Sequence, residues 1–179
     1  ALTGATVGMI AWLQPPPRPL IVPVWVAEYR TNELPTNVIA FRDRQAIRQA
    51  SGMPPLGAQM LSGQQRHLLL EQLASLATSP ADEDVLVFVC AYAAMGPDGV
   101  AILPADADLD DPQTWLPIRK ILACLAACPS QNKLLVFDIC WPVTEAYEGL
   151  LSTNLAAALP AELAAVPDPN RLVLPPCSP

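Results

Sequence analysis

The sequence predicts a single α/β domain, a three-layer α-β-α sandwich around a mostly parallel sheet. Two patterns predict this class. Short, nearly continuous apolar runs, typical of strands buried on both faces of a parallel sheet, alternate with helix-favouring stretches. Of the 179 residues, 52% are hydrophobic and only 15% are charged. That balance favours a packed body over disorder, and the length suits one domain.

Four apolar runs are expected to form the core strands. A fifth, shorter strand is expected at 100–104, after the tight turn GPDG. Because parallel strands need right-handed crossovers, helices should cover both faces of the sheet. The four core runs are 20–26 (LIVPVWV), 85–90 (VLVFVC), 134–139 (LLVFDI) and 171–174 (RLVL).

Helices are expected between these runs. The stretch 42–50 is charged and helix-favouring, and 62–76 repeats leucine at one-turn spacing. Thr114 is the predicted N-cap of a further helix. An alanine- and leucine-rich region spans 144–166, and Pro160 is expected to interrupt it.

Residues 1–19 are expected to lie outside the domain, which would span 20–179. The first thirteen residues are apolar and are followed by a cluster of prolines. They are fewer than the roughly 20 apolar residues that cross a bilayer. We interpret them as the trimmed end of a membrane segment plus a linker, although a buried element of the domain is the alternative. The domain itself is expected to be intracellular, attached to a membrane only through such an anchor.

Charge and cysteine content limit the partners. The net charge of -7 argues against nucleic acid and anionic membrane surfaces and favours a basic peptide or a cation. Five cysteines are an odd number for a disulfide framework. Cys124 and Cys128 have helical spacing but no second ligand pair, and the single histidine, His67, is far away, so no structural metal site is expected.

Ligands of open α/β sheets bind at the carboxyl ends of the strands. Tyr92 lies just after the run 85–90, Cys140 follows the run 134–139, and an acidic loop spans 106–111. We therefore expect these groups along one edge of the sheet. A glycine-rich phosphate loop is absent, so a nucleotide site is not expected.

Two segments, in this order, resemble the caspase and metacaspase family. The run VLVFVC continues into AYA, and Tyr92 stands where the family carries its general-base histidine between two glycines. ILPAD at 102–106 resembles the Pro-x-Asp segment that follows. LLVFDIC ends in Asp-x-Cys, so Cys140 matches the nucleophile, and RLVLPPCSP resembles the next core strand. The resemblance implies a caspase-like domain from residue 20 onward that ends before the family's last strand.

The resemblance also implies a substrate pocket. In metacaspases the aspartate of Asp-x-Cys lines an acidic pocket that selects arginine or lysine, and Asp138 matches it. Asp43 is the candidate for a second pocket acid, and Trp141 would lie at the mouth of the site. Metacaspases often bind calcium nearby, which raises Asp106, Asp110 and Asp111 as ligands. Because their spacing matches no defined calcium loop, we favour a solvated loop and no cofactor.

Replacement of the histidine weakens the expected chemistry. A free thiol has a pKa of about 8.5, and a neighbouring imidazole normally lowers it and protonates the leaving amine. A phenol with a pKa of about 10 does neither at neutral pH. A nearby Asp138 carboxylate would raise the pKa of the thiol further. Cys140 is therefore expected to be a weak nucleophile or an inert buried cysteine.

Three functions are compatible with these features. The preferred one is a bacterial-type caspase-like pseudoprotease that binds a protein or peptide as a regulatory module of a larger protein, inactive or weakly active as a peptidase. The alternative is a cysteine endopeptidase with Cys140 as nucleophile and a preference for arginine or lysine. The second alternative is a flavodoxin-like ligand-binding domain. An unpaired sheet edge would also favour a homodimer.

Overall fold

The computed structural model describes residues 19–31, 33–51, 64–140 and 155–175. Residues 1–18 of the predicted lead-in 1–19 fall outside these ranges, as do Trp141 and Cys177. Within the described residues, no helix is long and apolar enough to cross a membrane. In chain order the elements are β1 (Leu20–Trp25), α2 (Val38–Ser51), α4 (Arg66–Ala74), the 3-10 helix η1 (Ser75–Thr78), β2 (Val85–Gly96), β3 (Gly99–Ile102), the 3-10 helix η2 (Pro112–Thr114), β4 (Leu116–Pro117), α5 (Ile118–Ala127), β5 (Lys133–Cys140), α6 (Leu155–Ala165) and β6 (Arg171–Leu174).

The long strand β2 organises the sheet. It pairs in parallel with β1 on one side and with β5 on the other, and β6 adds to β5, also in parallel. The last residues of β2 turn into an antiparallel hairpin with β3, to which β4 adds. The described sheet therefore has six strands of mixed direction, with the four predicted core strands forming its parallel part. The predicted α/β class is confirmed.

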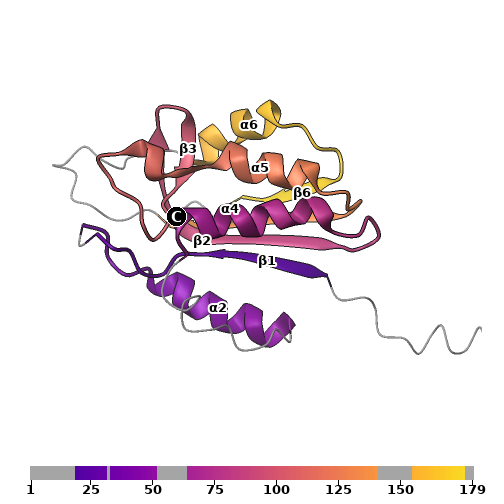
Figure 1. Cartoon of the computed structure of the whole chain (residues 1–179), viewed down its shortest axis with the longest axis horizontal. Helices are drawn as coiled ribbons and strands as arrows, with labels where there is room; N and C mark the ends of the chain where they lie inside the picture. The colour runs from indigo at the N-terminus through magenta and orange to yellow at the C-terminus, as the bar shows by residue number, and fades with distance from the viewer. Residues whose placement is uncertain (1–18, 32, 52–63, 141–154, 176–179) are drawn as a thin grey trace, which may run out of the picture.

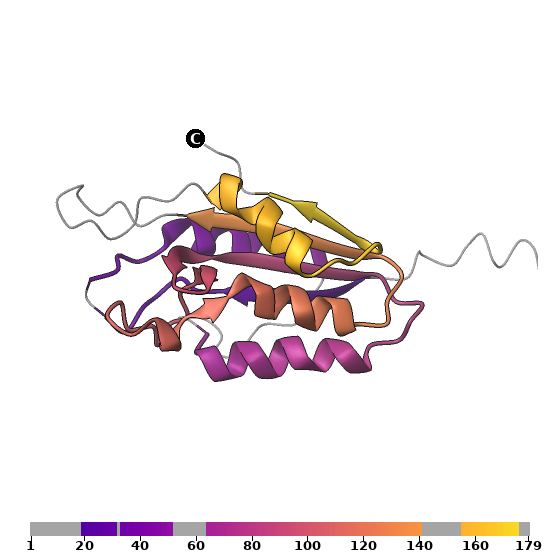
Figure 2. The same cartoon turned by 90° about the horizontal axis from the view of Figure 1, so that it is seen from above.

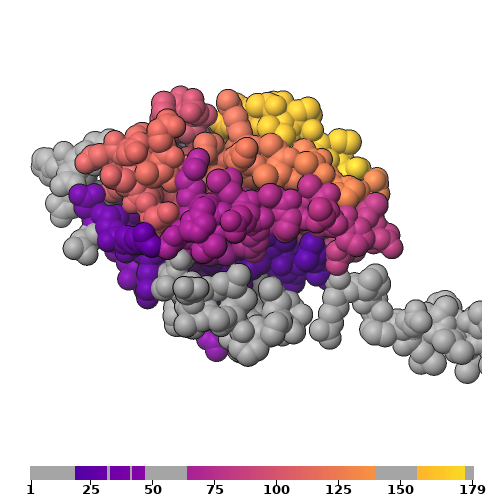
Figure 3. Space-filling model, viewed as in Figure 1, coloured from indigo at the N-terminus to yellow at the C-terminus, as the bar shows by residue number. Residues whose placement is uncertain are grey.

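Helices cover both faces of this sheet (Figures 1 and 2). Helices α4, α5 and α6 lie on one face, and α2 lies on the other. The space-filling view shows α4 and α5 side by side on the outer surface of the helix layer that they form with α6 (Figure 3). Beneath them, alternate residues of β1, β2 and β5 form the main apolar core with Leu69, Leu73, Ile121 and Leu125. Burying each such leucine or isoleucine contributes about 1.5–3 kcal/mol.

The opposite face of the sheet has a smaller apolar cluster beneath α2. Trp25, Ala27 and Cys90 pack there against Ala40 of α2. Helix α2 begins earlier than predicted because Asn37 caps it: its side-chain oxygen accepts the N–H of Ala40 at 3.1 Å. This cap holds the first turns of α2 over the carboxyl ends of β1, β2 and β5.

Further expectations about where elements begin and end are also wrong. Strand β2 does not end at residue 90 but continues to Gly96, because the hairpin with β3 supplies it with new partners. Thr114 does not cap α5. It belongs to η2, and its hydroxyl bonds within the acidic loop, donating to the Asp111 carbonyl at 2.7 Å.

Pro160 does not interrupt the last helix. It lies inside α6, which is anchored on both sides of it by buried Leu159 and by Glu162, whose carboxylate accepts the Arg119 side chain of α5. A proline costs a helix one backbone hydrogen bond, and these tertiary contacts offset that loss.

Candidate functional site

A row of three side chains crosses the sheet under α2, near the carboxyl ends of the parallel strands. The pairing register places Trp25 of β1 beside Cys90 of β2, and Cys90 beside Asp138 of β5. Because side chains alternate along a strand, residues in one such row share a face of the sheet. The row therefore presents an indole, a thiol and a carboxyl group to α2.

Asp43 of α2 completes the cluster from the helix that covers this face of the sheet. The ligand atoms of Asp43, Cys90 and Asp138 all lie within 4.8 Å of one another. Cys90 is fully buried, whereas both aspartates are half-buried. Within the described part of the chain, no other group of three or more His, Cys, Asp or Glu side chains converges in this way. The structure thus brings together the two acids that the sequence suggested for a pocket.

The two carboxyl groups share a hydrogen bond, which requires a proton between them. This hydrogen bond to Asp138 raises the pKa of Asp43 to about 6, helped by burial and by the charge of Asp138, while Arg42 opposes the shift. The Cys90 thiol donates to Oδ2 of Asp138 at 3.7 Å. Two carboxyl groups this close do not both ionise freely, because their negative charges repel each other. The pair therefore holds a proton readily or attracts a cation.

The strand positions of Tyr92 and Cys140 are direct neighbours in the β2–β5 register. Tyr92 is only 7% exposed and packs in a second apolar cluster with Leu103 and Trp115. Its ring stacks on Tyr29, with centroids 5.2 Å apart and planes 18° apart. The Tyr92 side chain is therefore a packed core group, and it does not stand at the end of a strand. The side chain of Cys140 lies outside the described residues, as does Trp141.

His67 lies far from this row. It is exposed on α4, whose buried residues Leu69 and Leu73 pack on the main core. That core covers the face of the sheet opposite to α2. Since the sequence has one histidine, the α2 side carries no imidazole.

The acidic loop uses its carboxylates to hold its own backbone. Asp106 accepts the N–H of Arg66 at 2.8 Å and so caps the start of α4. Asp111 accepts the N–H of Gln113 at 3.0 Å in η2. These two and Asp110, all described, do not form a group with converging ligand atoms. Calcium binding at this loop remains a prediction of the resemblance.

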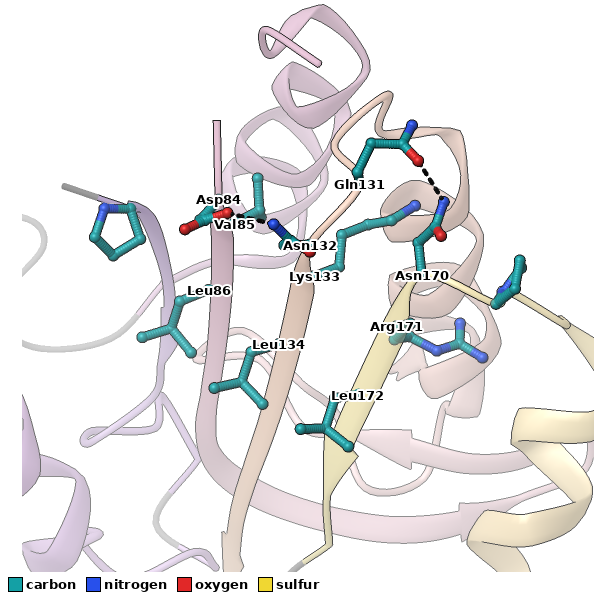
Figure 4. A pocket seen from close by; sticks show the side chains of 12 residues that line it. Asp84, Val85, Leu86, Gln131, Asn132, Lys133, Leu134, Asn170, Arg171 and Leu172 are labelled. Atoms are coloured by element: carbon teal, nitrogen blue, oxygen red, sulfur yellow. Dashed lines mark hydrogen bonds between the residues drawn. The ribbon is translucent and has the colours of Figure 1, made fainter. Parts of the chain in front are cut away.

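A groove of about 660 Å³ opens at the other end of the sheet, at the amino ends of β2, β5 and β6 (Figure 4). Leu86, Leu134 and Leu172 form its floor. Its rim carries two polar pairs, in which Asn132 donates to Asp84 at 2.8 Å and Asn170 donates to Gln131 at 3.4 Å. The sequence patterns did not indicate this groove, because its residues come from four separate segments.

Cys90 was also not predicted as a site residue. It is the last residue of the predicted run 85–90, and Asp138 lies near the end of the run 134–139. Aligning the ends of the two runs would have placed them near each other, which was the available signal. No protein-family model matches the chain, and a search of curated proteins also finds no match. The site must therefore be interpreted from its own residues.

Proposed function

We propose that this chain is a caspase-like pseudoprotease domain that binds a protein or peptide through a basic side chain, without efficient cleavage. The observation that carries the proposal is the register of β2 and β5, in which a tyrosine and not a histidine is the neighbour of Cys140. The order of elements supports it too. After β2 come a turn, the segment 102–106, helix α5 and a strand that ends at Cys140, as the resemblance implies.

Weak catalysis follows from the surroundings of this pair. A thiol becomes an efficient nucleophile when a base removes its proton and later protonates the leaving amine. Tyr92 is packed against Tyr29, and its backbone N–H donates to the Tyr29 hydroxyl at 2.9 Å. The lone imidazole, His67, is on the α4 side of the sheet. Neither residue supplies the proton transfer that peptide cleavage needs.

The acidic pair supplies the binding chemistry. Above pH about 6, Asp43 loses its proton beside the carboxyl group of Asp138, and both side chains are half-buried, so negative charge remains partly open to solvent. An arginine side chain fits such a pair because its planar fork donates two parallel hydrogen bonds to carboxylates. The partner is therefore expected to present arginine, or lysine as a second choice.

The test combines binding and cleavage on one set of peptides. Fluorescent peptides that differ only in arginine, lysine or alanine at one position are mixed with the wild-type chain, Cys140→Ala and Asp43→Asn/Asp138→Asn. We expect arginine peptides to bind wild type and Cys140→Ala equally, without cleavage. Loss of two charge-assisted hydrogen bonds should weaken binding by roughly tenfold or more in the double variant. Asp98→Asn, an exposed acid on the β2–β3 turn, is the matched control and should bind as wild type does.

Two results would overturn the proposal. Cleavage of the arginine peptide that disappears in Cys140→Ala would favour the endopeptidase alternative. Equal binding of arginine and alanine peptides would remove the acidic pair as a pocket. Separated positions of Tyr92 and Cys140 would favour the flavodoxin-like alternative, whereas the register makes these positions neighbours.

A further inference from the structure

We infer that Asp43, Cys90 and Asp138 form a binding site for a divalent metal ion of the zinc class. This inference goes beyond the proposed function: it shares the two carboxylates, so that a bound ion and an arginine side chain would compete for them, but it needs neither a peptide nor Cys140. The three side chains come from three different elements, α2, β2 and β5, that meet over one row of the sheet. Their ligand atoms already lie within 4.8 Å of one another.

The separations match those that a tetrahedral ion requires. Zinc binds sulfur at about 2.3 Å and carboxylate oxygen at about 2.0–2.2 Å, so neighbouring ligand atoms lie about 3.3–3.7 Å apart. The Cys90 sulfur is 3.7 Å from Oδ2 of Asp138, and the ligand atoms of all three side chains lie within 4.8 Å of one another. The atoms are therefore near the separations of a tetrahedral site.

The donor set selects the type of ion. One thiolate with two carboxylates suits a borderline-soft ion, whereas calcium and magnesium prefer all-oxygen ligands. Cys90 is a fully buried residue within the central strand, so the softest ligand has the most fixed position. The half-buried aspartates lie at the entrance and provide the path from solvent.

Two buried donors on the α2 side of the sheet lack acceptors. The indole Nε1 of Trp25 and the amide Nδ2 of Asn37 are buried and lack hydrogen-bond partners. Trp25 is 4% exposed and packs in the same cluster as Cys90, and Asn37 is 2% exposed at the cap of α2. An unsatisfied buried donor costs about 1–3 kcal/mol. A water or anion on a bound ion would bring an acceptor to this side of the sheet.

Binding must release protons, because metals bind the thiolate and the ionised carboxylates. The sulfur–hydrogen bond of Cys90 breaks, a sulfur–metal bond forms, and the proton passes to the buffer. Binding of each ion should therefore release at least the proton of the Cys90 thiol.

The experiment is a cobalt titration of the full chain, followed by zinc displacement. Cobalt bound to a thiolate gives a charge-transfer band in the near ultraviolet that reports the sulfur ligand directly. We expect one equivalent of cobalt to produce this band and zinc to remove it. Cys90→Ser should abolish the band, and Asp138→Asn should weaken affinity at least tenfold. Calorimetry in two buffers of different ionisation enthalpy measures the released protons.

Cys124→Ser is the matched control, because Cys124 is a half-buried cysteine of α5 in the helix layer on the opposite face of the sheet. It should keep the band unchanged. If Cys90→Ser does not fold, as judged by circular dichroism, Asp43→Asn decides instead. That change lies on the half-buried helix surface and should keep the band while lowering affinity at least tenfold. A wild-type chain without the band, a band that survives in Cys90→Ser, or undiminished affinity in Asp43→Asn would each overturn the inference. None of these readouts depends on whether a basic peptide binds.

Discussion

At the scale of single residues, the acidic pair makes stability depend on pH. Folding raises the pKa of Asp43 from 3.8 to about 6, chiefly through its hydrogen bond to Asp138. The folded chain therefore binds more protons than the unfolded chain between these two values. By linkage, the free energy of unfolding must fall as pH rises through this window, and this loss is complete above pH about 6.

Asp43→Asn should remove this loss. Since Asp43 is partly exposed to solvent, the effect is on the order of 1 kcal/mol, smaller than the pKa shift alone would give. We expect the variant to be more stable than wild type at pH about 7.5 by this amount, and the difference to shrink toward pH about 4. Urea unfolding at several pH values measures it.

The control for this effect is Asp98→Asn, whose carboxylate is exposed on the β2–β3 turn. Its unfolding free energy should follow the wild-type pH dependence. Parallel curves for wild type and Asp43→Asn would mean that the two acids do not share a proton in solution.

At the residue level, the sequence pointed to two of the three side chains that cluster under α2. Asp138 was suggested by the Asp-x-Cys pattern and Asp43 by a weaker match, and the structure brings both together. Cys90 was missed because no motif marks it; only the register between β2 and β5 sets it beside Asp138. Register is decided by which faces pack on the core, and a single strand pattern does not contain that information.

At the scale of elements, the turn between β2 and β3 depends on one glycine. Gly99 has φ of +105°, and a Cβ there would lie 2.2 Å from Oε1 of Glu162, a buried carboxylate of α6 that Arg119 holds. Gly99→Ala therefore meets both backbone strain and a clash. We expect a loss of about 1–3 kcal/mol in the free energy of unfolding, measured by urea denaturation.

Gly96 provides the comparison at the other side of the same turn. A Cβ on Gly96 would have its nearest contacts at 3.5 Å, an ordinary packing distance, and its φ is not positive. Gly96→Ala should cost less than about 1 kcal/mol. Equal losses for the two variants would show that neither the positive φ of Gly99 nor its contact with α6 makes alanine more destabilising there than at Gly96.

A buried ion pair joins α5, β5 and the segment before β6. Nζ of Lys133 lies 2.8 Å from Oδ2 of Asp168, and both side chains are at least 95% buried. The same ammonium donates to the carbonyls of Leu125 and Cys128 at 3.1 Å each. It thus closes the carboxyl end of α5, where a positive charge is favourable.

Lys133→Met should be strongly destabilising, because it removes the ion-pair partner of the buried Asp168 carboxylate and leaves it only the neighbouring charge of Arg171. The expected loss is about 3–5 kcal/mol in the free energy of unfolding. Lys133→Met/Asp168→Asn should lose less than the sum of the two single variants, as a double-mutant cycle in urea would measure. Lys120→Met, an exposed lysine of α5, should stay within about 0.5 kcal/mol of wild type. Additive losses would mean that the pair is not coupled.

Elements were predicted well where burial alone decides them and less well where tertiary contacts do. All four apolar runs became parallel strands. The ends of β2 and α5 were misplaced because hairpin pairing and loop hydrogen bonds determine them. The helix through Pro160 persists because α5 and the core hold it, and local propensity does not report such support.

At the scale of the whole molecule, the sheet separates two kinds of chemistry. The face under α4, α5 and α6 is an apolar core, and its covering helix α4 carries the exposed His67. The face under α2 carries the thiol and the two carboxyl groups. The alternation of strands and helices predicted helices on both faces, but which face would carry the polar cluster depends on the packing of α2, which only the three-dimensional arrangement determines.

The net charge of -7 is a property of the whole molecule that should affect how a basic peptide binds. A basic peptide should be attracted by the charge of the whole chain and held by the acidic pair. Exposed charges are screened over about 10 Å at 0.1 M salt and about 3 Å at 1 M. Peptide affinity should therefore fall roughly three- to tenfold between about 0.05 M and about 0.5 M salt, mainly through slower association. Stopped-flow fluorescence at several salt concentrations measures both rate constants.

The variant Asp43→Asn/Asp138→Asn separates the two contributions. Removing the pair lowers the negative charge by two out of seven, so most of the long-range attraction and of the salt dependence of association should remain. Dissociation, in contrast, should become roughly tenfold faster, because the charge-assisted hydrogen bonds that hold the basic side chain are lost. An association rate that is independent of salt in wild type would contradict the role of net charge. An unchanged dissociation rate in the double variant would place the basic side chain elsewhere on the molecule.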